Sequence, residues 1–168
     1  MRSAIARRPF GRRKRAITET PDDPGAAHAA ALALLARRDF SSAELRARLA
    51  EKGFGPAVID ELIAEFAESR AIDDARYVEH FVAQHAARGQ GPARIRQELG
   101  SLKIGAELIA EAIAAGADWG QRCREVRVRK FGADLPDSAH ERARQGRFLQ
   151  YRGFSSDHIR FALGSEDL

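Results

Sequence analysis

Apolar residues recur along the chain at an interval of fifty positions. Four columns are each filled three times, by Leu49, Leu99 and Leu149, by Phe54, Ile104 and Phe154, by Ile59, Ile109 and Ile159, and by Ile63, Ile113 and Leu163. A fixed period of this length is typical of an array of similar helical units rather than of one globular core. Because such arrays present a long surface, the pattern favours a binding protein over an enzyme with a pocket.

Residues that start and end helices divide the chain into nine predicted helices, with no sustained strand alternation. Ser41 and Glu44 have the spacing of a capping box, Asp73 is a predicted N-cap, and prolines open two helices. We expect the first helix to run from Ala26 to about Arg38. The seventh, eighth and ninth are predicted at 119–131, 136–152 and from Ser155 or Ser156 to 163.

These elements predict an all-α fold, a tandem array of three three-helix units. The predicted domains are a disordered basic arm and the three units, at 1–25, 26–70, 71–116 and 117–168. Loops inside each unit are short, so its second and third helices are expected to form a tight hairpin.

Charge is unevenly distributed along the chain. The net charge is +4, but residues 1–16 carry seven basic residues and no acidic one, so the remainder has a net charge of −3. Residues 60–79 are acidic, whereas residues 122–130 are mostly basic. The units are therefore expected to share a fold and to differ in what they contact.

Basic residues are the candidate binding groups for a partner protein or for DNA. The candidates are Arg76, Arg88, Arg94, Arg96, Arg122, Arg124, Arg127, Arg129, Lys130, Arg144 and Arg152. Most runs of charged residues are only solvated faces of a helix. These residues would therefore form a binding surface only if the array brings several of their side chains together. Because aromatic residues are not interleaved with them, contact with phosphates or an acidic protein is favoured over base stacking. The arm either adds salt-sensitive attraction to nucleic acid or is a tail without a role.

No motif supports catalysis or a bound cofactor. The sequence has no P-loop, dinucleotide-binding glycine pattern or nucleophile elbow. Asp73 and Asp74 fit a helix N-terminus better than a metal pair, and none of the five histidines has metal-site spacing. We expect no enzyme activity, no cofactor and no metal.

The remaining composition favours a cytoplasmic protein. The single cysteine, Cys123, excludes an internal disulfide, and the arginine-rich N-terminus lacks the apolar core of a signal peptide. No apolar run approaches the roughly 20 residues of a membrane span.

Four ordered segments carry a recognisable pattern. They read Ser41-x-x-Glu44-Leu45-x-x-x-Leu49-x-x-Lys52-Gly53-Phe54, Ile72-Asp73-Asp74-x-Arg76-Tyr77-x-x-x-Phe81-Val82, Arg88-Gly89-x-Gly91-x-x-x-Ile95-x-x-Glu98-Leu99 and Leu149-x-x-Arg152-Gly153-Phe154-x-x-x-x-Ile159. In this order and spacing they resemble the RecX family, the bacterial regulators of the RecA recombinase. Arg70 and Lys103 depart from the family pattern, which has glycine in those turns, so we expect these turns to be less tight.

The resemblance implies an elongated, curved protein that binds in the groove of the RecA–DNA filament and inhibits recombinase, ATPase and coprotease activities. Its partners would be the RecA filament and single- or double-stranded DNA, within the filament or weakly alone, and we expect a monomer. Two alternatives stay open. One is an autonomous helical DNA-binding protein that contacts the phosphate backbone, against which the negative charge beyond the arm argues. The other is a scaffold for another acidic or helical protein.

Overall fold

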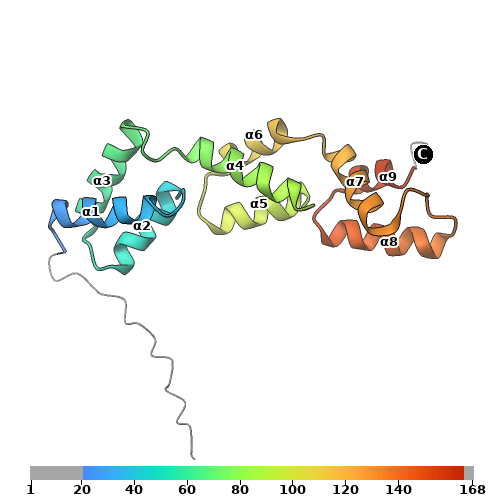
Figure 1. Ribbon diagram of the computed structural model, residues 1–168, viewed down its shortest axis with the longest axis horizontal. Helices are drawn as coiled ribbons and strands as arrows, with labels where there is room; N and C mark the ends of the chain where they lie inside the picture. The colour runs from blue at the N-terminus through green and yellow to red at the C-terminus, as the bar shows by residue number, and fades with distance from the viewer. Residues whose placement is uncertain (1–20, 165–168) are drawn as a thin grey trace, which may run out of the picture.

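The computed structural model describes residues 21–164, in which nine α-helices and no strands occur. The helices form three units that follow one another along the long axis of the molecule (Figure 1). Unit 1 holds α1 (Pro24–Leu35), α2 (Ser42–Glu51) and α3 (Pro56–Glu68), unit 2 holds α4 (Asp74–Ala87), α5 (Pro92–Ser101) and α6 (Ala106–Gly116), and unit 3 holds α7 (Trp119–Phe131), α8 (Ala139–Tyr151) and α9 (Ser156–Ala162). The predicted all-α tandem array is confirmed, whereas most of the predicted arm lies outside the described residues.

Local sequence explains where the helices begin. Six of them start after an Asp or Ser whose side-chain oxygen accepts a backbone N–H of the first turn: Asp23, Ser41, Asp73, Asp118, Ser138 and Ser155. The predicted cap at Asp73 is confirmed, since its carboxylate accepts the backbone N–H of Arg76 at 3.0 Å. Ser41 also caps its helix, but the Glu44 side chain bonds to Arg38 instead of completing a capping box.

Three predicted helix boundaries, both ends of α1 and the start of α8, are wrong by two to three residues. Helix α1 begins at Pro24 because Asp23 caps it, and it ends at Leu35 in a turn in which the Arg37 N–H donates to the Leu34 carbonyl. Helix α8 begins at Ala139 rather than near Pro136 because the Ser138 hydroxyl is its cap.

The turn after the second helix of each unit contains a residue with positive φ. Gly53 and Gly153 have φ of 95° and 93°, and Lys103 takes the equivalent place with φ of 61°. In units 1 and 3 a second bond closes the turn, from the N–H of Phe54 to Leu49 O and from that of Phe154 to Leu149 O. Within the described residues Ile104 forms no such bond, so the turn at Lys103 keeps the left-handed residue but is looser, as expected.

The apolar columns form two separate cores. Ten of the twelve column residues are buried, and Ile104 and Ile159 are partly buried. One core lies within unit 1, whereas the second is shared by units 2 and 3. In units 2 and 3 the third helix packs more on the first helix than on the second, so the predicted hairpin is not the main contact there.

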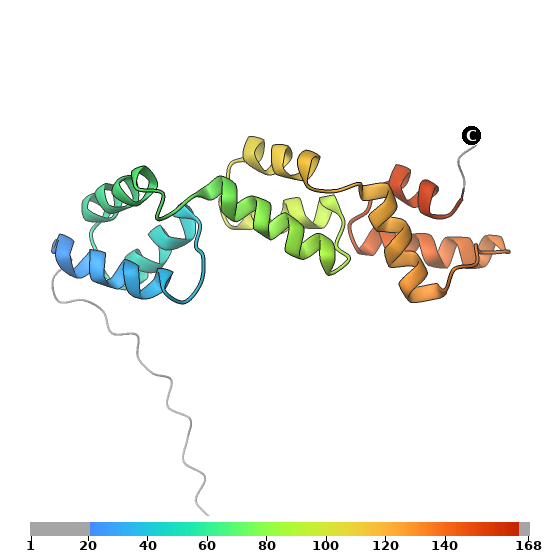
Figure 2. The ribbon, with the colours of Figure 1, turned by 45° about the horizontal axis from the view of Figure 1, so that its top comes forward.

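Backbone contacts join units 2 and 3 (Figure 2). The N–H of Gly91 donates to the Arg152 carbonyl at 2.8 Å, and that of Ala93 donates to the Gly153 carbonyl at 3.0 Å. A Cβ on Gly91 would lie 2.4 Å from the carbonyl carbon of Gly153, so no larger residue fits there. Units 1 and 2 are linked by the Ser42 N–H, which donates to the Asp74 carboxylate at 2.7 Å.

Candidate partner and nucleic-acid interface

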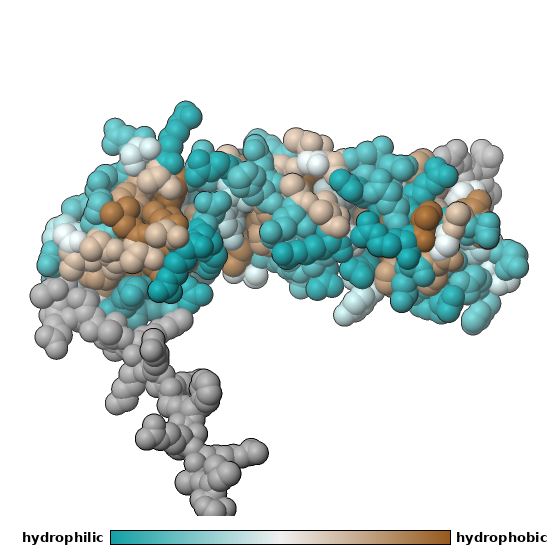
Figure 3. Space-filling model, in the orientation of Figure 1, coloured by the Kyte–Doolittle hydropathy of each residue, from teal (hydrophilic) through white to brown (hydrophobic). Residues whose placement is uncertain are grey.

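The three units differ strongly in charge. Unit 1 with its flanking residues, 21–70, has six basic and nine acidic residues, whereas residues 117–164 of unit 3 have ten basic and six acidic residues. On the face shown in Figure 3, units 2 and 3 are largely hydrophilic, while unit 1 exposes an apolar patch. The basic end of the array is therefore the place to look for contact with phosphates or acidic side chains.

Four of the candidate side chains converge where units 2 and 3 meet. Arg88 from the end of α4, Arg129 and Lys130 from α7, and Arg152 from the end of α8 line a shallow groove, here called the junction groove, together with Gly89, Val126 and Phe148. The Arg152 guanidinium lies 5.3 Å from the centre of the Phe148 ring and donates to the Arg88 carbonyl at 3.4 Å. This contact fixes one cation at the seam between the two units.

The other three cations of the junction groove carry unneutralised charge. Arg88, Arg129 and Lys130 are exposed, and none forms an ion pair with any residue in 21–164. Like charges held close together repel one another, so an anion bound between them would be favoured. The groove can thus receive phosphate oxygens or the carboxylates of a protein surface.

Several other candidates are already engaged by acidic neighbours. Ion pairs join Arg94 to Glu98 at 3.0 Å, Arg122 to Glu125 at 3.1 Å and Arg144 to Glu141 at 2.7 Å. Burial opposes ionisation of Glu98, but hydrogen bonds from Arg94 and Gln90 and the nearby His85 together hold its pKa below the ordinary value. These arginines therefore contribute less net charge to the surface than the sequence implied.

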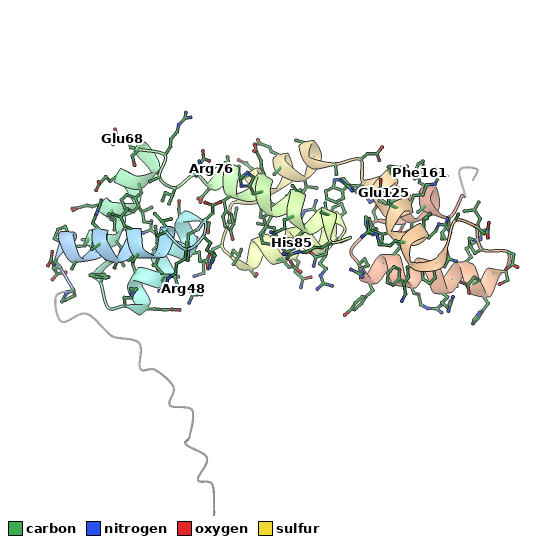
Figure 4. The ribbon with its side chains drawn as sticks, viewed as in Figure 1. Arg48, Glu68, Arg76, His85, Glu125 and Phe161 are labelled. Carbon is green, nitrogen blue, oxygen red and sulfur yellow. The ribbon has the colours of Figure 1, made fainter. Side chains whose placement is uncertain are left out.

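The remaining exposed candidates are scattered. Arg96 and Arg124 are exposed and have no ion-pair partner within the described residues. Arg76 lies in the first turn of α4, at the upper edge of the molecule in Figure 4, whereas Arg88 follows the last turn of the same helix. Arg76 is thus separate from the junction groove.

The prediction that Arg127 contacts a partner is wrong. Its side chain is 1% exposed, and its guanidinium donates to the carbonyls of Ala133 and Asp134 at 2.9 and 2.8 Å. Arg127 therefore holds the loop between α7 and α8 in place. The charge run gave no sign of this, because only the packing of α7 decides which of its arginines turns inward.

Sequence reasoning missed a second basic groove, in unit 1. It is lined by Leu34, Arg37, Arg38, Phe40, Arg48, Glu51 and Lys52. Arg38 and Arg48 bond to Glu44 and Glu51, so the groove is only weakly basic. The signal available in the sequence was Lys52, which directly follows the second helix of unit 1 as Arg152 directly follows that of unit 3.

The described residues offer no evident alternative chemistry. No group of His, Cys, Asp and Glu side chains in 21–164 is arranged to hold a metal ion. In the same part of the chain, every helix is too short or too polar to cross a membrane.

The sequence of this chain is similar to those of known proteins and matches models of one family. The models described as the first, second and third three-helix domains of RecX match residues 27–66, 73–113 and 120–163. The chain is 44% identical over 139 residues to the regulatory protein RecX of Ectopseudomonas mendocina (strain ymp), which covers 82% of this chain and 93% of that relative. The regulatory protein RecX of Halorhodospira halophila (strain DSM 244 / SL1) is 41% identical over 139 residues, covering 82% and 86%.

Solved structures share the same fold. The crystal structure of RecX from Lactobacillus salivarius superposes with a TM-score of 0.74 at 20% identity, covering 84% of this chain and 94% of that one. A second crystal structure, of a regulatory protein RecX, gives 0.70 at 19% identity and covers 85% and 72%. The domain matches and the level of identity together show that the chain belongs to the RecX family.

Proposed function

We propose that this protein is a non-enzymatic regulator that binds RecA-type recombinase filaments on DNA and inhibits their recombinase, ATPase and coprotease activities. Family membership supports a regulatory role, since the relatives are named regulatory proteins. The observation that carries the proposal is the junction groove, where three unpaired cations from two helices meet at the seam of a long array. Such a surface fits an extended, repeating, negatively charged partner.

The elongated arrangement of the three units supports a mechanism for this inhibition. Units lying along a filament would contact more than one recombinase subunit at once. Occupying that space would hinder entry of a second DNA strand and shift the subunits away from the arrangement that turns over ATP. The protein would act as a cytoplasmic monomer without a cofactor, and would meet single- or double-stranded DNA in the filament or weakly alone.

ATP turnover of RecA on single-stranded DNA, with the protein added in substoichiometric amounts, tests the proposal. We expect wild type to slow turnover and the variant Arg129→Ala/Lys130→Ala to need about 10-fold more protein for the same effect, because rim cations govern association. Arg147→Ala/Arg160→Ala removes the same charge from exposed positions of unit 3 outside the groove and should act like wild type. No slowing at any salt concentration or order of addition would overturn the proposal.

The same unpaired cations also favour a second candidate, an autonomous DNA-binding protein. Its discriminating measurement is binding to bare duplex and single-stranded DNA without recombinase. Tight, sequence-selective binding there would favour this candidate, whereas weak binding that falls steeply with salt would favour the filament regulator.

A further inference from the structure

Tyr151 is the most exposed large side chain among the apolar and aromatic residues described, at 79%. It is the last residue of α8 and lies on the rim of a groove between α5 and α8, lined also by Arg94, Gln97, Ser101 and Gln150. We call this the tyrosine groove. An aromatic ring that stands almost entirely in water contributes little to a core, and such rings are enriched where proteins bind partners.

The backbone beside Tyr151 is fixed against the neighbouring unit. The carbonyl of Arg152 accepts the Gly91 N–H, and the carbonyl of Gly153 accepts the Ala93 N–H. The backbone that carries the ring is therefore held at a defined place beside α5. A surface that is ordered before binding loses less conformational entropy on binding than a mobile one.

The tyrosine groove and the junction groove differ in chemistry but share one turn. In the tyrosine groove Arg94 is paired with Glu98, so the lining is close to neutral, and Gln97 and Gln150 carry amides that both donate and accept. The junction groove holds unpaired cations, and Arg152, the residue after Tyr151, lines it. One side of the turn thus suits a flat polar ring, and the other suits phosphates.

We propose that the turn at 151–153 is a binding site for single-stranded nucleic acid. A nucleobase stacks on the Tyr151 ring with its edge toward Gln97 and Gln150, and the adjoining phosphates lie in the junction groove. A duplex cannot use the ring in this way because its bases are already stacked on each other. The inference rests on the proposed function for the role of the junction groove, and it narrows the nucleic acid to a single strand and assigns the site that binds it. It also revises the expectation that contact with phosphates or an acidic protein is favoured over base stacking.

Binding of the full-length chain to two fluorescent oligomers, measured by anisotropy without recombinase, tests this site. One is an oligothymidine and the other an abasic oligomer of equal length and charge. Tyr151→Leu should bind oligothymidine about fivefold more weakly than wild type does, which is near the lower end of the range for stacking of one base on an aromatic side chain. The same variant should bind the abasic oligomer as tightly as wild type does. Tyr151→Phe keeps the ring and should stay within about twofold of wild type, whereas Arg129→Ala/Lys130→Ala should weaken both oligomers alike.

Tyr151→Trp supplies an independent readout. Trp119 is buried, so the emission that responds to ligand should come from the new, exposed indole. We expect oligothymidine to quench it and the abasic oligomer not to. Because Tyr151 is exposed, each variant should keep the helical circular dichroism of wild type.

Any of three results would contradict the proposed site. Wild type could bind the two oligomers with equal affinity, or Tyr151→Leu could bind oligothymidine as tightly as wild type does. In the third, Tyr151→Leu loses the same fraction of its affinity for both oligomers. If Tyr151→Leu instead weakens only inhibition of the recombinase, the ring is a protein contact and the inference is wrong. Failure of wild type to slow ATP turnover would overturn the proposed function alone, because the oligomer assay contains no recombinase.

Discussion

Lys103 adopts the left-handed backbone conformation, with φ of 61°, in a turn where units 1 and 3 have glycine. A side chain in this region brings Cβ close to the following carbonyl, at a cost of roughly 1–2 kcal/mol. The turn survives because the packed helices on either side require it. The backbone strain in this turn lies at Lys103 alone, so a substitution at this one position can remove it.

Lys103→Gly should therefore raise the free energy of unfolding by about 0.5–1 kcal/mol, after the greater entropy of unfolded glycine offsets part of the relieved strain. Urea denaturation is the measurement. Lys52→Gly is the matched control, because Lys52 has φ of −84° and no strain to relieve. A gain in the control and none at Lys103 would contradict the assignment.

Arg127 shows how one position in a charge run can have a role its neighbours lack. Arg127→Ala should lower the free energy of unfolding by about 2–4 kcal/mol, because it empties a buried site and leaves the carbonyls of Ala133 and Asp134 without donors. Arg124→Ala, an exposed change on the same helix, should stay within about 0.5 kcal/mol of wild type. Equal thermal stability of the two variants would contradict the structural role of Arg127 and would make it a candidate binding residue again.

At the scale of elements, one ion pair ties the α1–α2 loop to α2. Two hydrogen bonds join the Arg38 guanidinium to the Glu44 carboxylate, and the same guanidinium lies 3.9 Å from the centre of the Phe40 ring. These bonds, with smaller charge effects from Arg38 and Arg48, hold the pKa of Glu44 below its ordinary value although burial opposes this. The pair therefore stabilises the folded state only while Glu44 is ionised.

Glu44→Gln should reduce the free energy of unfolding by about 0.5–1 kcal/mol at neutral pH. The contribution of a carboxylate with a lowered pKa is present above its unfolded pKa and is lost as the pH falls through its lower, folded pKa. The difference in the free energy of unfolding between wild type and variant should therefore shrink as the pH of the denaturation curves is lowered from about 7 toward 3. Glu107→Gln, on an exposed position of α6, controls for the loss of charge, and a difference that persists in acid would exclude ionisation as its cause.

At the scale of the molecule, the fifty-residue repeat contributes to two separate cores. Substitution of equivalent leucines in the repeat should therefore destabilise different parts of the molecule. Leu49 belongs to the core of unit 1, whereas Leu99 and Leu149 belong to the core shared by units 2 and 3. Cys123 lies in the shared core, and burial raises the pKa of its thiol to about 12. The thiol therefore reports opening of that core alone.

Each of Leu49→Ala, Leu99→Ala and Leu149→Ala should cost about 2–5 kcal/mol in the core that holds it, because all three side chains are fully buried. The rate of Cys123 alkylation should rise in Leu99→Ala and Leu149→Ala and stay near wild type in Leu49→Ala. Leu32→Ala, on an exposed position, is the control for leucine loss. Equal acceleration in all three core variants would mean that the molecule unfolds as one unit.

The helices and several of their caps were predictable because they depend on neighbours a few residues away along the chain, and the apolar columns were predictable because they recur at a fixed interval. Asp73 caps its helix by bonding to an N–H three residues on, and Leu99 is buried because every unit needs an apolar residue at that place. The candidate site was predictable only as a set of cations. Arg129 and Lys130 belong to the junction groove and Arg127 does not, and nothing in the run of charge distinguishes them.

The sequence by itself determined the repeat, the class of fold and the basic character of unit 3, since these depend on composition and spacing. Only the tertiary structure decided that units 2 and 3 share a core and that α7 turns Arg127 inward. It also decided that the Gly91 and Gly153 backbones touch, which brings Arg88 beside Arg152 and holds the backbone next to Tyr151 beside α5. The physical reason is that these contacts follow from how whole helices pack, and that packing brings together residues from distant parts of the chain.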